Sequence, residues 1–317
     1  MEELIMTSAS RSPAKAGWIK GGLLATATIA WLIAGQPAQA GLFGRDKAPA
    51  ATRHPTPASA GVVEAVQRAL DDDRLSDAGR LLDQAFAGGE RDLRLVLLSG
   101  RLNLAKGRYD AALASFAAAE ADPALGARAA EGRGLTLSRL NRSDEAVKAL
   151  TQATMADPNL WRAWNALGVE QDRRKNWAEA ENAYLQALKA PSAQAEVYCN
   201  QGYSMMLQGR YEEATGAFVS ALQKDPGLSQ ARTNLRLALA MRGDYAKATT
   251  ISASEDRAAV LNNAGFVAML RGDLDQAESL FNQAIEARGS FYSRAYENLT
   301  LVRGLRKGSV VAGGHAP

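Results

Sequence analysis

Residues 161–190 read WRAWNALGVEQDRRKNWAEAENAYLQALKA, and this stretch decides the fold. In its second half Ala180 is followed by Tyr184 at i+4 and by Ala187 at i+7. That spacing places small and large apolar side chains along one face of a helix. Gly168 stands twelve residues before Ala180, inside another stretch of helical character. The pattern predicts two helices that pack where the glycine meets the alanine and are joined by a turn at RKN.

The same pattern recurs with a period of 34 residues. The alanines that mark it are Ala78, Ala112, Ala146, Ala180, Ala214 and Ala248. Four residues after five of them stand Leu82, Phe116, Leu150, Tyr184 and Phe218. The small residue twelve positions earlier is Gly100, Gly134, Gly168 and Gly202 in four units. Prolines at the unit ends, such as Pro158, stop one helix and start the next. A tandem array of helix pairs is therefore expected.

These recurring positions are the ones that define the tetratricopeptide repeat (TPR) family, which the chain resembles most fully at Trp164, Leu167, Gly168, Ala180, Tyr184 and Ala187. The resemblance implies an all-α fold, a right-handed α-solenoid of about seven helix-turn-helix repeats over residues 59–291. The expected repeat starts are Ser59, Leu93, Ala127, Trp161, Ala195, Ser229 and Ala258. A capping helix is expected over 292–306, followed by a disordered tail over 307–317.

The sixth repeat departs from the period. Its alanine, Ala248, is followed by the next one, Ala277, after 29 residues instead of 34. The second helix of this repeat, around TTISASEDR, is therefore expected to be brief or distorted.

The first 58 residues are expected to serve targeting and spacing. A basic stretch ending at Lys20 precedes the apolar run GGLLATATIAWLIAG, and Ala38 and Ala40 supply a small-x-small cleavage pattern. Residues 1–40 are interpreted as a cleaved signal peptide that sends the chain to the periplasm, and 41–58 as a flexible Pro/Ala-rich leader. An uncleaved anchor is the alternative, although the run is shorter than the ~20 residues that span a bilayer.

Composition weakens the case for an enzyme and for a nucleic-acid binder. The single cysteine, Cys199, and the two histidines, His54 and His315, leave little material for a metal site or for nucleophilic catalysis. We expect no catalytic residue, metal or cofactor. The net charge is +3, but six of the 37 basic and three of the 34 acidic residues precede residue 61. The repeat region is thus net neutral, which disfavours nucleic acid as a partner.

The family resemblance implies that the first helices line a concave wall that binds a protein or peptide partner. The predicted groove residues are Arg94, Arg101, Arg128, Arg139, Arg162, Arg173, Tyr203, Met206, Met241, Asn262, Phe266 and Met269. An apolar segment of the partner would dock on the aromatic and methionine end, and its carboxylates would reach the arginines. The competing interpretation is that the arginines form a solvated face balanced by acids, while the apolar set packs between repeats. Asn200, Asn234, Asn263 and Asn298 share one repeat position, and their amides serve either a ligand or the structure.

The wider role is expected to lie in the bacterial cell envelope. Residues 261–299, LNNAGFVAMLRGDLDQAESLFNQAIEARGSFYSRAYENL, are similar to the TPR component of Tad-type (Flp) pilus assembly. That component is typically a lipoprotein, and this chain lacks the lipid-bearing cysteine. A noncatalytic adaptor is expected, with the partner and the oligomeric state left open. The alternative is a peptidoglycan- or polysaccharide-binding accessory, in which Trp161, Trp164 and Trp177 would stack on sugars.

Overall fold

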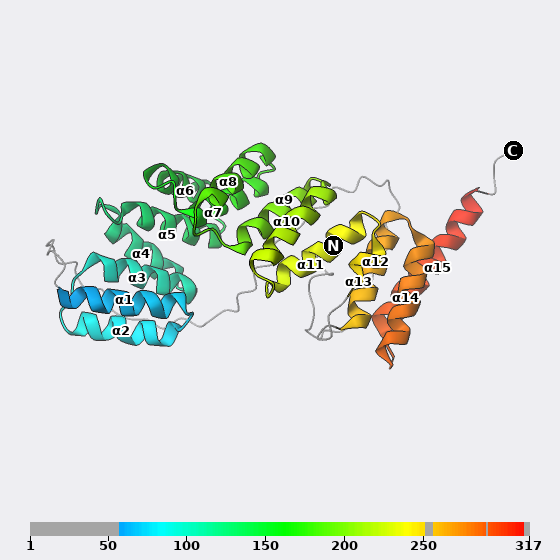
Figure 1. The fold of residues 1–317 in the computed structure, drawn as a ribbon, viewed down its shortest axis with the longest axis horizontal. Coiled ribbons are helices and arrows are strands. Elements are labelled where there is room, and N and C mark those ends of the chain that lie inside the picture. Colours follow the sequence, from blue (N-terminus) through cyan, green and yellow to red (C-terminus); the bar gives the residue numbers. More distant parts are fainter. Residues whose placement is uncertain (1–56, 251–255, 290, 314–317) are drawn as a thin grey trace. The chain divides into compact units, whose positions relative to one another are not determined.

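The structure, a computed structural model, describes residues 57–250, 256–289 and 291–313. The predicted signal peptide, the leader up to residue 56 and both histidines lie outside the described residues. Over the described ranges all regular secondary structure is α-helical and no strand occurs (Figure 1). The predicted all-α fold of tandem helix pairs is confirmed.

The helices follow the expected order. They are α1 (Pro57–Asp71), α2 (Leu75–Ala87), α3 (Leu93–Ala105), α4 (Tyr109–Glu120), α5 (Gly126–Arg139), α6 (Ser143–Ala156), α7 (Trp161–Arg173), α8 (Trp177–Lys189), α9 (Ala195–Leu207), α10 (Tyr211–Lys224), α11 (Ser229–Met241), α12 (Tyr245–Ala248), α13 (Arg257–Arg271), α14 (Leu274–Arg288) and α15 (Ser293–Gly313). The odd-numbered helices from α1 to α13 are the first helices of the pairs, and each begins within two residues of the start expected from the period, whereas α15 is the capping helix.

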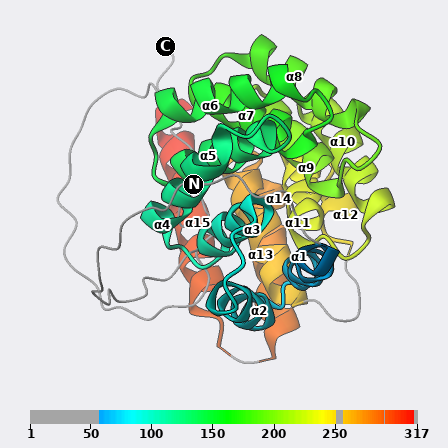
Figure 2. The ribbon, with the colours of Figure 1, turned by 90° about the vertical axis from the view of Figure 1, so that its left-hand side faces the viewer.

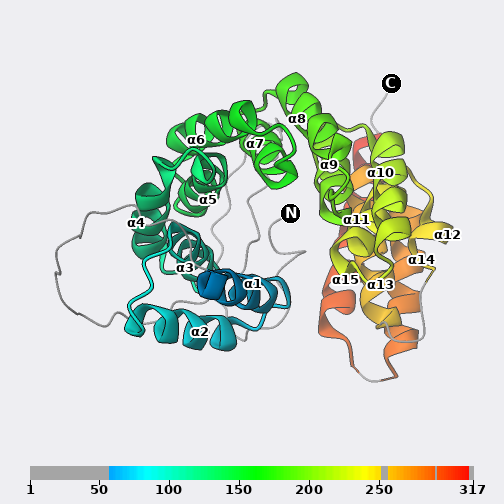
Figure 3. The same ribbon diagram turned by 60° about the vertical axis from the view of Figure 1, so that its left-hand side comes forward.

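The described residues form two compact units. The N-terminal unit contains residues 57–204 and 220–228, and the C-terminal unit contains 205–219 together with the described residues from 229 onward. Within the N-terminal unit, α1, α3, α5 and α7 lie on the inner side of an arc, with α2, α4 and α6 on its outer side (Figure 3). The two helices of a pair run side by side, as α5 and α6 do in Figure 2.

Close packing in several pairs depends on the recurring glycine of the first helix. A Cβ atom added at Gly100 would lie 2.7 Å from Cε1 of Phe116, and one at Gly168 would lie 2.7 Å from Cε1 of Tyr184. The large residue four positions after the recurring alanine thus fills the space that the glycine leaves, a contact that the sequence pattern did not predict.

One ring also serves two successive repeats. Phe116 is fully buried, and a Cβ atom added at Gly132 of α5 would lie 2.3 Å from its Cε1 atom. The ring is thus held between Gly100 of its own repeat and Gly132 of the next.

The turn inside each pair contains one residue with positive φ, at intervals of 34 residues from Asp73 to Gly243 and of 29 residues from there to Gly272. Glycine fills this position in four repeats (Gly107, Gly209, Gly243 and Gly272), and Asp73, Asn141 and Lys175 fill it in the other three. These three residues lack the freedom of glycine, and left-handed backbone costs an ordinary side chain about 1 kcal/mol or more. In the RKN turn the left-handed residue is Lys175, with φ 60°.

The C-terminal unit contains the irregular repeat. Its second helix, α12, has four residues, as the shortened period predicted, and residues 251–255 lie outside the described ranges. The Tyr245 hydroxyl of α12 donates a hydrogen bond of 2.5 Å to Oδ2 of Asp273, just before α14. Arg271 donates to the same carboxylate at 3.0 Å and to the Met241 carbonyl at the end of α11. These contacts fasten the short helix to its neighbours.

The last three helices pack around one apolar cluster. Buried Leu261, Phe281 and Leu299 come from α13, α14 and α15, which lie side by side in Figure 1. Helix α15 continues to Gly313, seven residues beyond the expected end at Arg306, so the tail expected from 307 onward is helical up to that point. Residues 307–312 contain no proline and only one glycine, so the chain carries no strong stop signal there.

Candidate functional site

The candidate binding surface lies on the first helices of the N-terminal unit. Arg101 of α3 donates from Nη2 to Oδ1 of Asp71, the last residue of α1, at 3.0 Å. Arg162 of α7 is exposed, and its guanidinium carbon lies 4.6 Å from the ring centroid of Trp161. Arg128 of α5 is also exposed. Three predicted arginines are thus presented by three successive first helices.

Glu131 of α5 lies among these three arginines. Burial raises the pKa of Glu131, and the charges of Arg162, Arg101 and Arg128, together with a hydrogen bond from the Ala163 backbone N–H, oppose that rise. Leu160, the residue before α7, provides no side-chain cap for the N–H groups of the first turn of α7.

The six predicted arginines fall into two groups. Arg94, Arg101 and Arg173 form ion pairs with Asp92, Asp71 and Glu170. Arg128, Arg139 and Arg162 are exposed and form no ion pair with the described residues. The expectation of a face balanced by acids thus holds for the first three side chains, whereas the other three remain available to a partner.

A fully buried carboxylate joins the third and fourth helix pairs. Glu170 of α7 is 0% exposed and accepts from the Ser138 hydroxyl at 2.5 Å, the Ser143 hydroxyl at 2.6 Å and Arg173 Nη1 at 2.6 Å. Sequence reasoning missed Glu170, although an acid inside the apolar stripe of a first helix is a usable signal. With all its partners present, the group belongs to the structure and not to a reaction centre.

A second buried carboxylate, Asp172, lies near the same end of α7. It accepts from the Tyr184 hydroxyl at 2.7 Å and from the Ser204 hydroxyl at 2.6 Å. Burial raises the pKa of Asp172, and these two hydrogen bonds oppose the rise. Burial also raises the pKa of Tyr203, helped by the nearby charge of Asp172. The side chain of Tyr203, a predicted groove residue, is itself only partly exposed.

Part of this array of helix pairs matches a known family. Residues 132–196, and again 195–228, match family descriptions of the tetratricopeptide repeat. Residues 132–228 contain tetratricopeptide repeats.

Similar solved structures are TPR proteins as well. One from Parabacteroides merdae has 18% sequence identity and a TM-score of 0.47, covering 77% of this chain and 98% of its own. YrrB, described as a TPR protein with an unusual peptide-binding site, has 18% identity and a TM-score of 0.46, covering 57% of this chain and 96% of its own. A thermophilic TPR protein of Thermus thermophilus has 18% identity and a TM-score of 0.49, covering 60% of this chain and 97% of its own. No curated protein matches the chain.

In the C-terminal unit, the predicted apolar residues pack between TPR helices. Met241 packs against the cluster of Leu239 and Val267, while Phe266 and Met269 pack against the core of α13–α15. Met206 is partly buried. These positions fit the interpretation in which such side chains fill the space between repeats, and each keeps only part of its surface exposed.

The recurring asparagines are used in two places to join successive repeats. Asn298 of α15 donates to Oδ1 of Asn262 in α13 at 3.0 Å, and Asn200 of α9 donates to Oδ1 of Asn165 in α7 at 3.1 Å. Asn262, predicted as a groove residue, is 2% exposed. These amides satisfy one another inside the array, whereas Asn263 is exposed.

The cysteine and two of the tryptophans that could have served catalysis or sugar binding are buried or hydrogen-bonded within the fold. Cys199 is buried, and the described ranges contain no group of three metal-ligating side chains. Trp161 is buried, and the Trp164 indole N–H donates to the Pro158 carbonyl at 3.0 Å. Among the described residues, no helix is sufficiently long and apolar to cross a bilayer.

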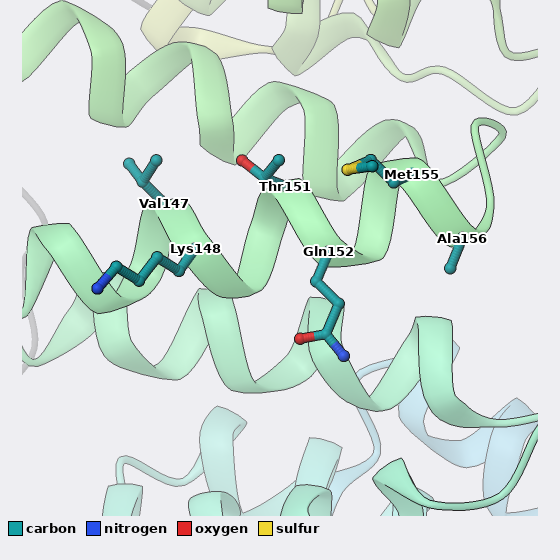
Figure 4. Close-up of a pocket in the computed structure, with 6 residues that line it drawn as sticks. All are labelled: Val147, Lys148, Thr151, Gln152, Met155 and Ala156. Atoms are coloured by element: carbon teal, nitrogen blue, oxygen red, sulfur yellow. The ribbon is translucent and has the colours of Figure 1, made fainter.

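The outer face of the third repeat carries a shallow hollow (Figure 4). All six lining residues come from α6: Val147, Lys148, Thr151, Gln152, Met155 and Ala156. Met155 is 80% exposed. Because a single helix provides the whole lining, no polar groups converge on the hollow as they do in an active site.

Proposed function

We propose that the chain is a noncatalytic adaptor of the bacterial periplasm that holds a protein partner on the first helices of its N-terminal unit. TPR arrays generally act as protein-interaction scaffolds, because stacked helix pairs create an extended surface. The observation that carries the proposal is the presence of exposed Arg128 and Arg162 on successive first helices, without an ion pair in the described part of the chain.

A photo-crosslinking experiment in cells tests the location of the partner. A photoreactive residue at Arg128, on the inner side of the α5–α6 pair, is compared with one at Lys148, on α6. Both positions are exposed, so reactivity toward solvent is matched. We expect a protein adduct from position 128 and little from 148. Adducts from 148 alone would place the partner on the outer face and contradict the proposal.

The periplasmic location rests on the N-terminal sequence. We propose cleavage after Ala40, leaving Gly41 as the first residue of the mature chain. N-terminal sequencing of the protein from a periplasmic fraction tests this directly. A chain that keeps residues 1–40 and sediments with the inner membrane would instead be anchored.

The most specific proposal is a role in assembling a Tad-type (Flp) pilus or a related secretion complex. It is supported by the similarity of residues 261–299 to the TPR component of that system. Reading frames for a pilin, a prepilin peptidase and a secretion ATPase beside this one would support it, and loss of pili in a deletion strain would test it. Buried Trp161 and partly buried Trp164 and Trp177 disfavour the sugar-binding alternative.

A further inference from the structure

Helix α15 has the surroundings of a first helix but no second helix of its own. It packs against α14 and α13, as α7 packs against α6 and α5. The asparagine bond between α15 and α13 also repeats the one between α9 and α7. In the N-terminal unit each first helix is covered by the second helix of its own pair, as α7 is by α8. Among the described residues no helix covers α15 in that way.

The uncovered side of α15 and the residues just before it carry exposed apolar side chains. Of the eight large apolar residues that are exposed in the described ranges, four lie between 291 and 305: Phe291, Tyr296, Leu301 and Leu305. The rings of Phe291 and Tyr296 stack with their centroids 5.0 Å apart. The end of a repeat array normally presents a polar face to water. A cluster of exposed apolar side chains at this end therefore indicates a surface that another molecule covers.

The same face carries one acid and one base in a fixed order. With 3.6 residues per turn, Glu297, Thr300 and Gly304 lie opposite the buried side of α15, and Lys307 lies beside them. Glu297 and Lys307 are exposed, and neither forms an ion pair with a described residue. A Cβ atom added at Gly304 would meet none of the described residues within 4 Å. The middle of the face is thus open and small enough for another helix to approach closely.

The other bases of α15 lie away from the middle of this face. Arg303 and Arg306 pair with Glu278 of α14. Arg294 is exposed on the flank of Leu305, on the other side of the face from Lys307. Glu297 is consequently the acid, and Lys307 the base, that a helix crossing the middle of α15 would meet.

An antiparallel copy of α15 matches this order of charges. With a two-fold axis near residue 302, Glu297 of each copy lies opposite Lys307 of the other, and Thr300 lies opposite Gly304. Leu301 of each copy then lies beside Leu305 of the other. A parallel pair would instead place Glu297 against Glu297 and Lys307 against Lys307, and like charges repel. The charges therefore favour an antiparallel second copy.

We infer that the chain forms a symmetric dimer in which α15 of one copy packs antiparallel against α15 of a second copy. This goes beyond the proposed function, because the contact lies in the C-terminal unit and not on the arginine-bearing first helices. One helix from each copy buries less surface than a standard interface of about 1,600 Å². We therefore expect a reversible dimer with a dissociation constant on the order of 10 μM. Each dimer then carries two copies of the surface proposed for the adaptor.

Sedimentation velocity of the purified full chain tests the dimer. From about 1 to 200 μM, the weight-average mass should rise from that of a monomer toward that of a dimer. Leu301→Glu places a charge in the contact and should weaken self-association at least about tenfold. Leu185→Glu on α8 is the matched control and should leave self-association unchanged, because Leu185 is 48% exposed and Leu301 is 51% exposed. Circular dichroism identifies any variant that has lost helix content.

Charge reversal tests the antiparallel order. Glu297→Lys and Lys307→Glu should each weaken self-association about fivefold at low salt, because each places like charges opposite one another at two points of the symmetric contact. An equimolar mixture of the two variants should associate as the original chain does, since both points then join opposite charges. The mixture also keeps the test informative if Leu301→Glu does not fold.

The results distinguish this dimer from other occupants of the same face. A chain that stays monomeric over the whole concentration range would overturn the inference and leave the face to a different protein. Equal self-association of folded Leu301→Glu and Leu185→Glu would overturn it too, as would charge variants that do not recover on mixing. None of these results bears on adduct formation at position 128, so the adaptor surface and the dimer can fail separately.

Discussion

The same substitution, Gly to Ala, should have opposite effects on stability at Gly100 and Gly216. Both residues lie inside helices, where alanine is favoured over glycine by about 1 kcal/mol. At exposed Gly216 of α10 a new Cβ atom would meet none of the described residues within 4 Å. At Gly100 it would lie 2.7, 2.9 and 3.0 Å from three ring atoms of Phe116, so the ring or the helix must move. We estimate the cost of this overpacking as about 2–3 kcal/mol.

The net changes follow from these two contributions. Gly216→Ala should raise the free energy of unfolding by about 1 kcal/mol, and Gly100→Ala should lower it by about 1–2 kcal/mol. Urea unfolding of the full chain, followed by circular dichroism, measures both. A second replacement, Phe116→Leu, frees space at the contact, so its cost should be smaller in the Gly100→Ala background than alone. Equal and stabilising effects at both glycines, or strict additivity with Phe116→Leu, would refute the packing argument.

Three further predictions concern the turn and the buried carboxylates of the same region. Lys175→Gly should stabilise the protein by about 1 kcal/mol in the same assay because it relieves positive φ, while Asn141→Gly should gain only a few tenths; no gain at 175 would contradict this. Glu170→Ala should cost about 3 kcal/mol because it leaves buried donors without their acceptor, whereas exposed Glu179→Ala on α8 should change stability by under about 0.5 kcal/mol. Since burial raises the pKa of Asp172 above 3.8, the folded chain holds that proton more tightly than the unfolded chain, so its contribution to stability falls as pH rises through the window above 3.8. In Asp172→Asn the urea midpoint should no longer decrease with pH across that window. A plot of midpoint against pH with an unchanged slope would contradict the assignment.

The fold could be predicted from the sequence because its signal is periodic. Alanines at 34-residue intervals fixed the number and order of helix pairs, and the 29-residue interval before Ala277 identified the short α12. The pattern does not show which side chain faces which. The contact of Gly100 with the ring of Phe116, for example, was not predicted. Similarly, the turn at RKN was recognised, but the sequence did not show that Lys175 takes the left-handed conformation.

The predicted site contained six arginines, and the structure divides them into two groups. Arg94 and Arg173 pair with acids two or three residues away in the sequence, whereas Arg101 pairs with Asp71, which lies 30 residues away in the preceding repeat. The asparagine pair of Asn262 and Asn298 likewise joins different repeats. Local sequence patterns predict the helices, whereas the contacts between repeats can be recognised only in the packed structure.

The short helix α12 has a consequence for how the C-terminal unit comes apart. In a repeat array each unit is stabilised mainly by its neighbours, so cooperativity passes from one interface to the next. A four-residue helix offers little apolar surface to its neighbours. Polar contacts among Tyr245, Asp273 and Arg271 replace part of that apolar contact. Amide protons of α11 should therefore exchange with solvent independently of those in α13–α15, with α12 as the boundary between two folding units. The five-residue shortening of this repeat would then divide the C-terminal unit into two parts, each able to unfold locally while the other remains folded.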